Sequence, residues 1–292
     1  MPPTGVPYCE HEDILRYEEL LCIAEAAISL GIEKIRITGG EPLVRKGLLD
    51  FLKRLRVLPG LSELTLTTNG LLLEETAEQL KAVGVNRINV SLDSLDPQTY
   101  EQITHGGDVE RVLTGLKAAE QAGLPLKLNM VVMRGINDHE IKDFAAVSQK
   151  HPWSVRFIEY MPTLRELSWP NRMVPGGEIL ERLCQSFTLS PISSSRLCGP
   201  SKSYRIESAI GTVGIITPMS EPFCSDCNRI RVTAQGLAKG CLLSNQTFDL
   251  KPTLTQGMEA VRAALSEVIS GKNLQHHFVG KGRSFQMSRI GG

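Results

Sequence analysis

The chain has 292 residues, enough for one large hydrophobic core or two smaller ones. Its 32 Lys and Arg balance its 32 Asp and Glu, so net charge gives no reason to expect nucleic acid or an anionic membrane as a partner. Seven cysteines, an odd number, and no apolar segment near the start argue against a secreted disulfide framework, and no apolar run reaches membrane-spanning length. We expect a soluble cytoplasmic protein that holds any anion with a local group of cations.

The sequence of residues 17–161 predicts helices and strands that alternate with the spacing of βα units. Helices are expected at residues 17–30, 43–56, 74–82, 109–122 and 138–149. Strands are expected at residues 34–38, 63–69, 87–93, 127–133 and 155–161. Strands separated by helices imply a parallel sheet, which is either open or curled into a barrel.

The expected strands alternate in polarity, whereas parallel strands covered by helices are usually apolar throughout. The polar residues that share a face are Arg36 and Thr38, then Thr65, Thr67 and Asn69, then Asn89, Ser91 and Asp93, and finally Lys127 and Asn129. A half-solvated sheet is one interpretation. The other is a barrel whose lumen holds water or a ligand, because buried polar groups without partners are costly. The intervening helices favour the second.

The tetrapeptide Gly39-Gly40-Glu41-Pro42 follows the first expected strand, at the strand end where βα folds place ligands. Two glycines allow a ligand to lie against bare backbone, and the Glu41 carbonyl or carboxylate can accept a hydrogen bond from an amine. The alternative is a plain turn that leads into a helix with proline in its first turn.

The pattern changes after residue 163. A connector at 163–175, a helix at 178–185, short strands at 203–207 and 213–217 and a helix at 256–269 predict a second, smaller unit. We therefore expect two domains, at residues 1–163 and 164–292. The basic tail that ends in Gly291-Gly292 is expected to be disordered.

Three cysteines near the C-terminus form the most specific motif. Cys224 and Cys227 have C-x-x-C spacing, and Cys241 returns after an Arg-x-Arg strand and a turn marked by glycine. Three thiolates leave one metal position open for a substrate atom, whereas a structural zinc site takes four ligands. A zinc knuckle with a distant fourth ligand and a thiol-redox pair are the alternatives, and spacing alone does not separate iron–sulfur from zinc. Arg229 and Arg231 alternate on the expected strand, so both should face one side, as a site for a polyanion beside a metal requires.

These motifs together resemble the GTP 3',8-cyclase family of radical S-adenosylmethionine enzymes, which open molybdenum cofactor biosynthesis. The resemblance rests on Gly-Gly-Glu-Pro, Thr-Thr-Asn-Gly at 67–70, Asn-Val-Ser-Leu-Asp-Ser at 89–94, the cysteine segment with Arg-x-Arg, and the terminal Gly-Gly. It spans essentially the whole chain. It implies an α/β fold, a partial (β/α)6 TIM-type barrel that lacks its first strand, followed by a smaller C-terminal α+β domain with a second [4Fe–4S] cluster.

The resemblance also implies the chemistry. In the family, one [4Fe–4S] cluster reduces S-adenosylmethionine to a 5'-deoxyadenosyl radical, which takes hydrogen from C3' of GTP. The C3' radical then attacks C8 to give 3',8-cyclo-7,8-dihydro-GTP, while an open iron of the second cluster binds guanine. By motif, Cys224, Cys227 and Cys241 ligate the second cluster, the GTP contacts are Arg36, Thr67, Lys127, Arg229, Ile230 and Arg231, and the S-adenosylmethionine contacts are Gly40, Ser91 and Met161.

The expected partners are therefore GTP, S-adenosylmethionine, an electron donor and the cyclic pyranopterin monophosphate synthase that acts next, and a homodimer is compatible with the sequence. One departure concerns the start of the chain. The family begins with a strand and a C-x-x-x-C-x-x-C motif for the first cluster, and Met-Pro follows directly after that motif. This sequence begins Met1-Pro2-Pro3, so its first residues correspond to the position just after the third cysteine of the motif. Cys9 and Cys22 lack the spacing to replace that motif, and Cys22 is expected inside a helix as core packing.

A misassigned start codon, a fragment and a degenerate paralogue are the three explanations of this departure, and the intact second-cluster motif favours the first two. Two rival functions are kept. A peptide-modifying radical S-adenosylmethionine enzyme would carry more cysteines after Cys241 than this chain has. The other rival is a catalytically inactive module that binds GTP and an iron–sulfur cluster.

Overall fold

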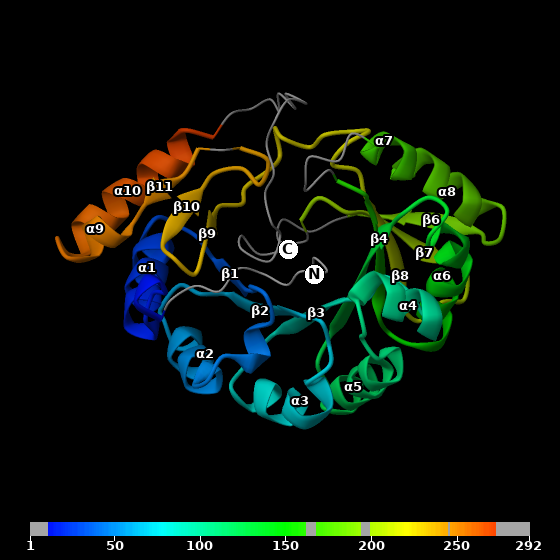
Figure 1. Ribbon diagram of the computed structural model, residues 1–292, viewed down its shortest axis with the longest axis horizontal. Helices are drawn as coiled ribbons and strands as arrows, with labels where there is room; N and C mark the ends of the chain where they lie inside the picture. The colour runs from blue at the N-terminus through cyan, green and yellow to red at the C-terminus, as the bar shows by residue number, and fades with distance from the viewer. Residues whose placement is uncertain (1–10, 162–167, 194–198, 245, 273–292) are drawn as a thin grey trace. The chain divides into compact units, whose positions relative to one another are not determined.

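The computed structural model describes residues 11–161, 168–193, 199–244 and 246–272, so the expected disordered tail lies outside the described residues. The chain divides into two compact units, whose helices and strands are labelled in Figure 1. Unit 1 comprises Met1–Thr67, Ala82–Asn86 and Asn228–Gly292, and unit 2 comprises Thr68–Lys81 and Arg87–Cys227. The division into domains at residue 163 stays a prediction.

Unit 1 contains a parallel pair of strands, a small antiparallel sheet and two long helices. Its elements are η1 (His11–Asp13), α1 (Tyr17–Ser29), β1 (Lys34–Ile37), η2 (Pro42–Val44), α2 (Leu48–Arg56), β2 (Glu63–Thr68), β9 (Arg231–Val232), β10 (Leu237–Lys239), β11 (Phe248–Asp249), α9 (Lys251–Leu254) and α10 (Met258–Ser270). Strands β1 and β2 run parallel, with Arg36 opposite Thr65. The antiparallel sheet has the order β11-β10-β9.

The core of unit 1 lies where α1 packs against α10. Apolar residues recur on both helices at intervals of three and four, which gives each helix one buried face. These residues include Ile23, Ala26 and Ala27 of α1 and Val261, Ala264 and Leu265 of α10. Cys22 packs against the same core, as the sequence predicts, and burial raises the pKa of its thiol.

Unit 2 is built on one sheet with helices packed against it. Its elements are α3 (Leu73–Ala82), β3 (Arg87–Ser91), α4 (Pro97–Thr104), α5 (Val109–Gln121), β4 (Leu126–Val132), η3 (Asp138–Glu140), α6 (Ile141–Lys150), β5 (Ser154–Glu159), α7 (Trp169–Arg172), α8 (Gly176–Cys184), β6 (Leu189–Ile192), β7 (Lys202–Ile206) and β8 (Thr212–Ile216). Strands β3, β4, β5 and β8 are parallel neighbours, and β7 and β6 continue the sheet antiparallel. The expected α/β fold with a parallel sheet is confirmed.

The two faces of this sheet differ, as the alternating sequence predicts. Ile88 and Val90 of β3 and Leu128 of β4 are fully buried, and α5 and α6 pack against β4 and β5 respectively. The strand register places polar residues together on the other face, because residues opposite each other in a parallel pair share a face. These pairs are Asn89 with Lys127, Ser91 with Asn129, and Asn129 with Arg156.

Among the elements that differ from the sequence-based expectation are two helices. The helix expected at 43–56 is split into η2 and α2, because Gly47 adopts a left-handed conformation with φ of 78° between them. Helix α4 was not expected. Asp96 caps it by accepting a hydrogen bond from the Thr99 N–H at 2.8 Å, and Pro97 occupies its first turn. Within the described ranges, no helix is long and apolar enough to cross a membrane.

Candidate functional site

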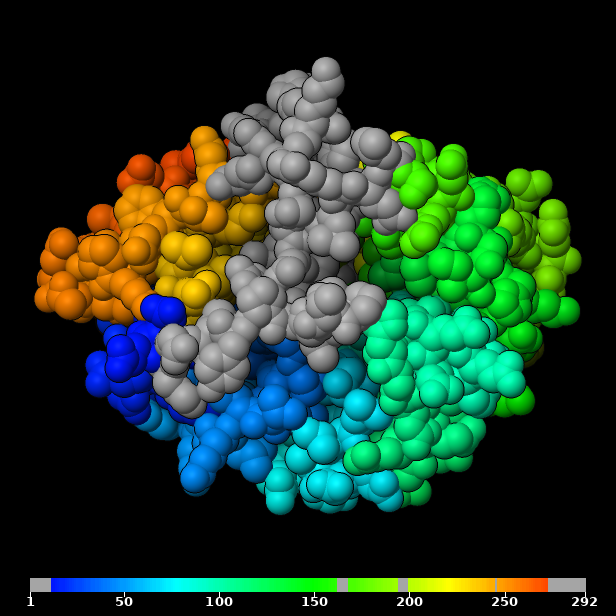
Figure 2. Space-filling view, in the orientation of Figure 1, coloured from blue at the N-terminus to red at the C-terminus, as the bar shows by residue number. Residues whose placement is uncertain are grey.

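The β9–β10 hairpin of unit 1 carries the arginines next to the cysteine motif. Strand β9 is shorter than expected and begins at Arg231, so Arg229 precedes it. Ile230 and Val232 pack against the α1–α10 core. Because successive side chains of an extended chain point to opposite sides, Arg229 and Arg231 point away from that core. Figure 2 shows the hairpin (yellow to orange) beside α9 and α10 (orange) on the visible surface of unit 1.

A lysine that the motif analysis missed lies in the same hairpin. Lys239 is directly opposite Arg231 in the β9–β10 pair, and only 6% of its surface is exposed. Desolvation lowers the pKa of its ammonium group, while the Cys241 thiol opposes this shift and Arg231 adds to it. Among the residues that the structure describes, no carboxylate pairs with Lys239. Two cations opposite each other in a sheet repel, so this arrangement favours a bound anion.

The end of α10 supports the hairpin from behind. The Lys272 ammonium donates a hydrogen bond to the carbonyl oxygen of Arg229 at 2.9 Å. A Cβ atom on Gly240 would lie 3.1 Å from Lys272 Cγ and from the Val268 carbonyl oxygen. Glycine directly before Cys241 therefore permits this close approach, which fixes the backbone on both sides of the hairpin.

The three cysteines are half-buried thiols. Cys224 and Cys227 belong to unit 2, where the Cys227 N–H donates to the Cys224 carbonyl oxygen at 3.2 Å and closes the C-x-x-C turn. Cys241 belongs to unit 1 and follows β10 by two residues. Taken singly, neither unit brings three His, Cys, Asp or Glu side chains together for a metal ion within its described residues. By their chemistry, three half-buried thiols are a donor set that suits an iron–sulfur cluster.

The remaining expected contacts in unit 1 lie on or after β1 and β2. Arg36 is exposed on β1, and Thr67 is buried near the end of β2. The Thr67 hydroxyl has no hydrogen-bond partner among the described residues, although it is buried. A Cβ atom on Gly40 would meet nothing within 4 Å, so open space adjoins its backbone. A buried hydroxyl without a partner and open backbone are features of a surface that receives a ligand.

In unit 2 the expected residues lie on the polar face of the sheet or just beyond it. Ser91 ends β3 and Lys127 lies on β4, while Met161 follows β5 by two residues. Asn129, opposite Ser91, has a buried side-chain oxygen without a hydrogen-bond partner in the described part of the chain. The sequence predicted its face, but the motifs gave it no role.

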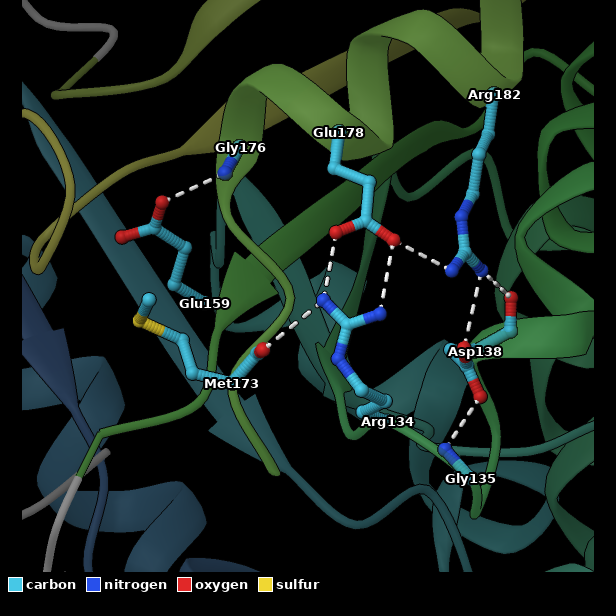
Figure 3. Close-up of polar contacts among 8 residues, drawn as sticks. All are labelled: Arg134, Gly135, Asp138, Glu159, Met173, Gly176, Glu178 and Arg182. Atoms are coloured by element: carbon cyan, nitrogen blue, oxygen red, sulfur yellow. Dashed lines mark hydrogen bonds and ion pairs between the residues drawn. The ribbon is translucent and has the colours of Figure 1, made fainter. Parts of the chain in front are cut away.

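A buried carboxylate at the end of β5 was missed by the sequence analysis. Glu159 is fully buried and accepts a hydrogen bond from the Gly176 N–H at 2.7 Å (Figure 3). The sequence does contain an indication of it, because Glu159 is an acidic residue on the same side of the strand as the buried Val155 and Phe157. A carboxylate at such a position requires several donors. Lys239 carried a comparable signal, because it lies two residues before Cys241 on a strand.

Comparison with known protein families gives two matches that together extend over most of the chain. Residues 4–147 match the model of the radical SAM superfamily, and residues 153–278 match the model described as Molybdenum Cofactor Synthesis C. The GTP 3',8-cyclase of Geobacter sulfurreducens is 50% identical over 297 aligned residues, which cover all of this chain and 91% of that protein. The GTP 3',8-cyclase of Peptoclostridium acidaminophilum is 44% identical and is covered to 90%.

Among solved structures, the one described as "Native anSMEcpe with bound AdoMet" has a TM-score of 0.48 and 17% sequence identity. The alignment covers 63% of this chain and 54% of that chain. A likeness of this size carries no conclusion about the ligands of the present chain.

Proposed function

The chain belongs to the GTP 3',8-cyclase family of radical S-adenosylmethionine enzymes, and we infer from this membership how its residues serve the reaction. It is an enzyme of the first step of molybdenum cofactor biosynthesis, in which GTP is cyclised to (8S)-3',8-cyclo-7,8-dihydroguanosine 5'-triphosphate. The fold that we propose for this task is a partial (β/α)6 barrel followed by a C-terminal domain, with the boundary near residue 163.

We propose that Cys224, Cys227 and Cys241 hold a [4Fe–4S] cluster with one open iron. Each of the three thiolates binds one iron, so the fourth iron has no protein ligand. The cations of the hairpin offset the negative charge of the thiolates. Together with S-adenosylmethionine, iron–sulfur clusters supply the radical chemistry and the guanine anchor of this family. The donor set of three cysteines supports iron–sulfur over structural zinc, which takes four protein ligands.

The proposed GTP contacts are Arg36, Thr67, Lys127, Arg229, Ile230 and Arg231, and we add Lys239. The observation that carries this assignment is the burial of Lys239 opposite Arg231 with Cys241 beside it. A triphosphate offers several negative charges, and guanidinium groups bind phosphate oxygens in pairs. The Ile230 side chain packs against the core, so its contribution to GTP comes from its main chain.

For S-adenosylmethionine we propose Gly40, Ser91 and Met161. The open space beside Gly40 supports backbone contact with the amino acid part of the cofactor. Ser91 lies on the polar face of unit 2, where its hydroxyl is exposed for a ribose or carboxylate partner. An external electron donor, a following synthase, a homodimeric state and a location in the cytoplasm stay predictions.

The test of the GTP site is equilibrium binding of GTP to Arg229→Ala and Arg231→Ala variants reconstituted with iron. Each charge-assisted pair stabilises binding by about 1.5–3 kcal/mol, so the dissociation constant should rise roughly tenfold to a hundredfold. Lysine at either position should restore only part of the affinity, because it keeps the charge and loses the planar fork.

Arg262→Ala is the matched control, since Arg262 is exposed on α10 of the same unit and its ion pair with Glu259 is long, at 3.5 Å. Iron content should be equal in all five variants. If both hairpin alanine variants bind GTP as the unaltered chain does, the triphosphate is held elsewhere.

A further inference from the structure

The carboxylate of Glu159 joins three segments of unit 2. Its Oε2 accepts hydrogen bonds from the N–H groups of Met219 and Ser220 at 2.8 and 2.9 Å. Its Oε1 accepts one from the Gly176 N–H at 2.7 Å and one from the Ser220 hydroxyl. A fully buried carboxylate is stable only when donors replace its lost hydration, and here four donors do so. The end of β5, the start of α8 and the loop after β8 therefore depend on one side chain.

That loop leads directly to the first two cysteine ligands. The Thr217 hydroxyl donates to the Glu221 carbonyl oxygen at 3.2 Å, and Glu221 forms an ion pair with Lys202. Cys224 follows Glu221 by three residues, which span at most about 10 Å. The C-x-x-C turn is therefore attached by a short tether to a loop whose beginning is fixed at Glu159.

The α8 end of this connection is itself rigid. A Cβ atom on Gly176 would lie 2.3 Å from Thr217 Cγ2, so only glycine allows helix and loop to approach this closely. Two residues on, Glu178 binds Arg134 through both carboxylate oxygens at 3.0 and 2.6 Å, and Arg182 at 2.6 Å (Figure 3). These bonds lower the pKa of Glu178, the hydrogen bond from Arg134 being the largest cause. Glu159 thus fastens the cysteine loop to a helix that cannot easily move.

We propose that Glu159 is a positioning residue for the [4Fe–4S] site: through Met219 and Ser220 it sets where the Cys224 and Cys227 thiols lie. This role rests on the proposed function of those cysteines as cluster ligands. The Glu159 carboxylate accepts its hydrogen bonds from the loop and from the start of α8, so it acts through the loop and not as a ligand. Without it, the ligand turn would sample open positions and bind iron less tightly.

The same unit contains a second glutamate that serves as a matched control. Glu140 is 4% exposed and also accepts from two successive backbone N–H groups and a serine hydroxyl. Its donors are the N–H groups of Leu95 and Asp96, at 2.6 and 3.3 Å, and the hydroxyl of Ser94, at 2.6 Å. Glu140→Gln therefore breaks the same kind of bonds in a loop that carries no cysteine.

The experiment compares Glu159→Gln with Glu140→Gln in the full chain. An amide in place of the carboxylate turns one acceptor into a donor and places it against N–H groups. In the metal-free chain, alkylation of Cys224 and Cys227, followed by mass spectrometry, should be about tenfold faster in Glu159→Gln, because about one charge-assisted hydrogen bond is lost. The exposed Cys184 gives the reference rate within each sample. On anaerobic reconstitution, Glu159→Gln should bind iron with about tenfold lower affinity, and Glu140→Gln should resemble the unaltered chain.

Ser220→Ala removes only the hydroxyl donor, so it should give a smaller change in the same direction and keeps the test decisive if Glu159→Gln is poorly folded. Equal alkylation rates in Glu159→Gln and Glu140→Gln would overturn the proposal and leave Glu159 as a general stabiliser of unit 2. A different result, in which even the unaltered chain takes up no iron, would refute the cluster assignment and leave the alkylation test of Glu159 valid.

Discussion

At the scale of single residues, the charges that the fold buries are the most informative. Lys239 and Asp93 are both placed where their charged form is disfavoured by lost hydration. A buried charged group lowers stability unless a ligand or a partner offsets its lost hydration. Each of these two residues therefore predicts the direction in which a substitution changes stability or binding.

Lys239→Met should weaken GTP binding about tenfold, because one phosphate partner is lost from the buried side of the hairpin. The unfolding free energy of the ligand-free chain should stay the same or increase, since a desolvated cation opposite Arg231 is removed. Chemical denaturation and GTP binding measure the two effects. Lys53→Met, on the exposed surface of α2, is the control. A lysine that is only structural would instead give a less stable chain with unchanged GTP affinity.

Asp93 makes the stability of the chain depend on pH. Burial raises the pKa of its carboxyl group from 3.8 to about 6, against the opposing hydrogen bond from the Val131 N–H. The folded state therefore holds this proton more tightly than the unfolded state. The resulting stability is complete below about pH 4 and is lost as the pH rises through about 6.

Asp93→Asn cannot ionise, and its amide oxygen can still accept from Val131. The variant should gain stability over the unaltered chain as the pH rises from 4.5 to 8, by up to about 3 kcal/mol for a shift of about two pKa units. Urea denaturation across this range measures the difference. A gap between the two chains that is the same at every pH would show that Asp93 is not the titrating group.

At the scale of elements, unit 1 depends on the packing of α1 against α10. Leu265 is fully buried in this contact, and Lys272, two residues after the end of α10, donates a hydrogen bond to the backbone of Arg229. The same helix thus stabilises the unit and supports the hairpin that carries the cations.

Leu265→Ala should lower the unfolding free energy by about 2–5 kcal/mol, because it removes buried methyl groups and leaves a cavity. Glu267→Ala, on the exposed side of the same helix, should change it by less than about 0.5 kcal/mol. Thermal or urea unfolding of both variants measures the difference. Similar losses in the two variants would mean that α10 contributes through helix propensity and not through its buried face.

At the scale of the whole molecule, the 292 residues contain the proposed ligands of one cluster. The sequence includes Cys224, Cys227 and Cys241 and has no C-x-x-x-C-x-x-C motif. Expressed as these residues alone, the polypeptide should bind about four irons after anaerobic reconstitution. It should form no 5'-deoxyadenosine from S-adenosylmethionine, because that cleavage needs the other cluster.

Addition of an N-terminal segment with the C-x-x-x-C-x-x-C motif should bring the iron content to about eight and start the cleavage. Iron analysis and chromatographic detection of 5'-deoxyadenosine measure both outcomes. Stoichiometric zinc without iron uptake would contradict the cluster assignment. Cleavage by the 292 residues alone would show that the radical chemistry resides in other residues.

The sequence by itself determined the family, the alternation of helices and strands, and the polar face of the parallel strands. These features are local, because a C-x-x-C pair, a glycine-rich turn and the alternation of polar and apolar residues along a strand each involve only neighbouring positions. Residues such as Arg229, Arg231 and Cys224 became candidates because their spacing is typical of a metal site beside an anion site. Local pattern did not predict every helix, however: the helix expected at 43–56 is split at Gly47, and α4 was not expected.

Only the tertiary structure pointed to Lys239 and Glu159. In the sequence, Lys239 is one charged residue among many, and its significance follows from a strand pairing that sets it opposite Arg231 in a place with little water. Glu159 meets Gly176, Met219 and Ser220, which lie 17 to 61 positions further along the chain. Burial and long-range hydrogen bonds are properties of the folded chain, because they exist only after segments far apart in sequence have displaced the water between them.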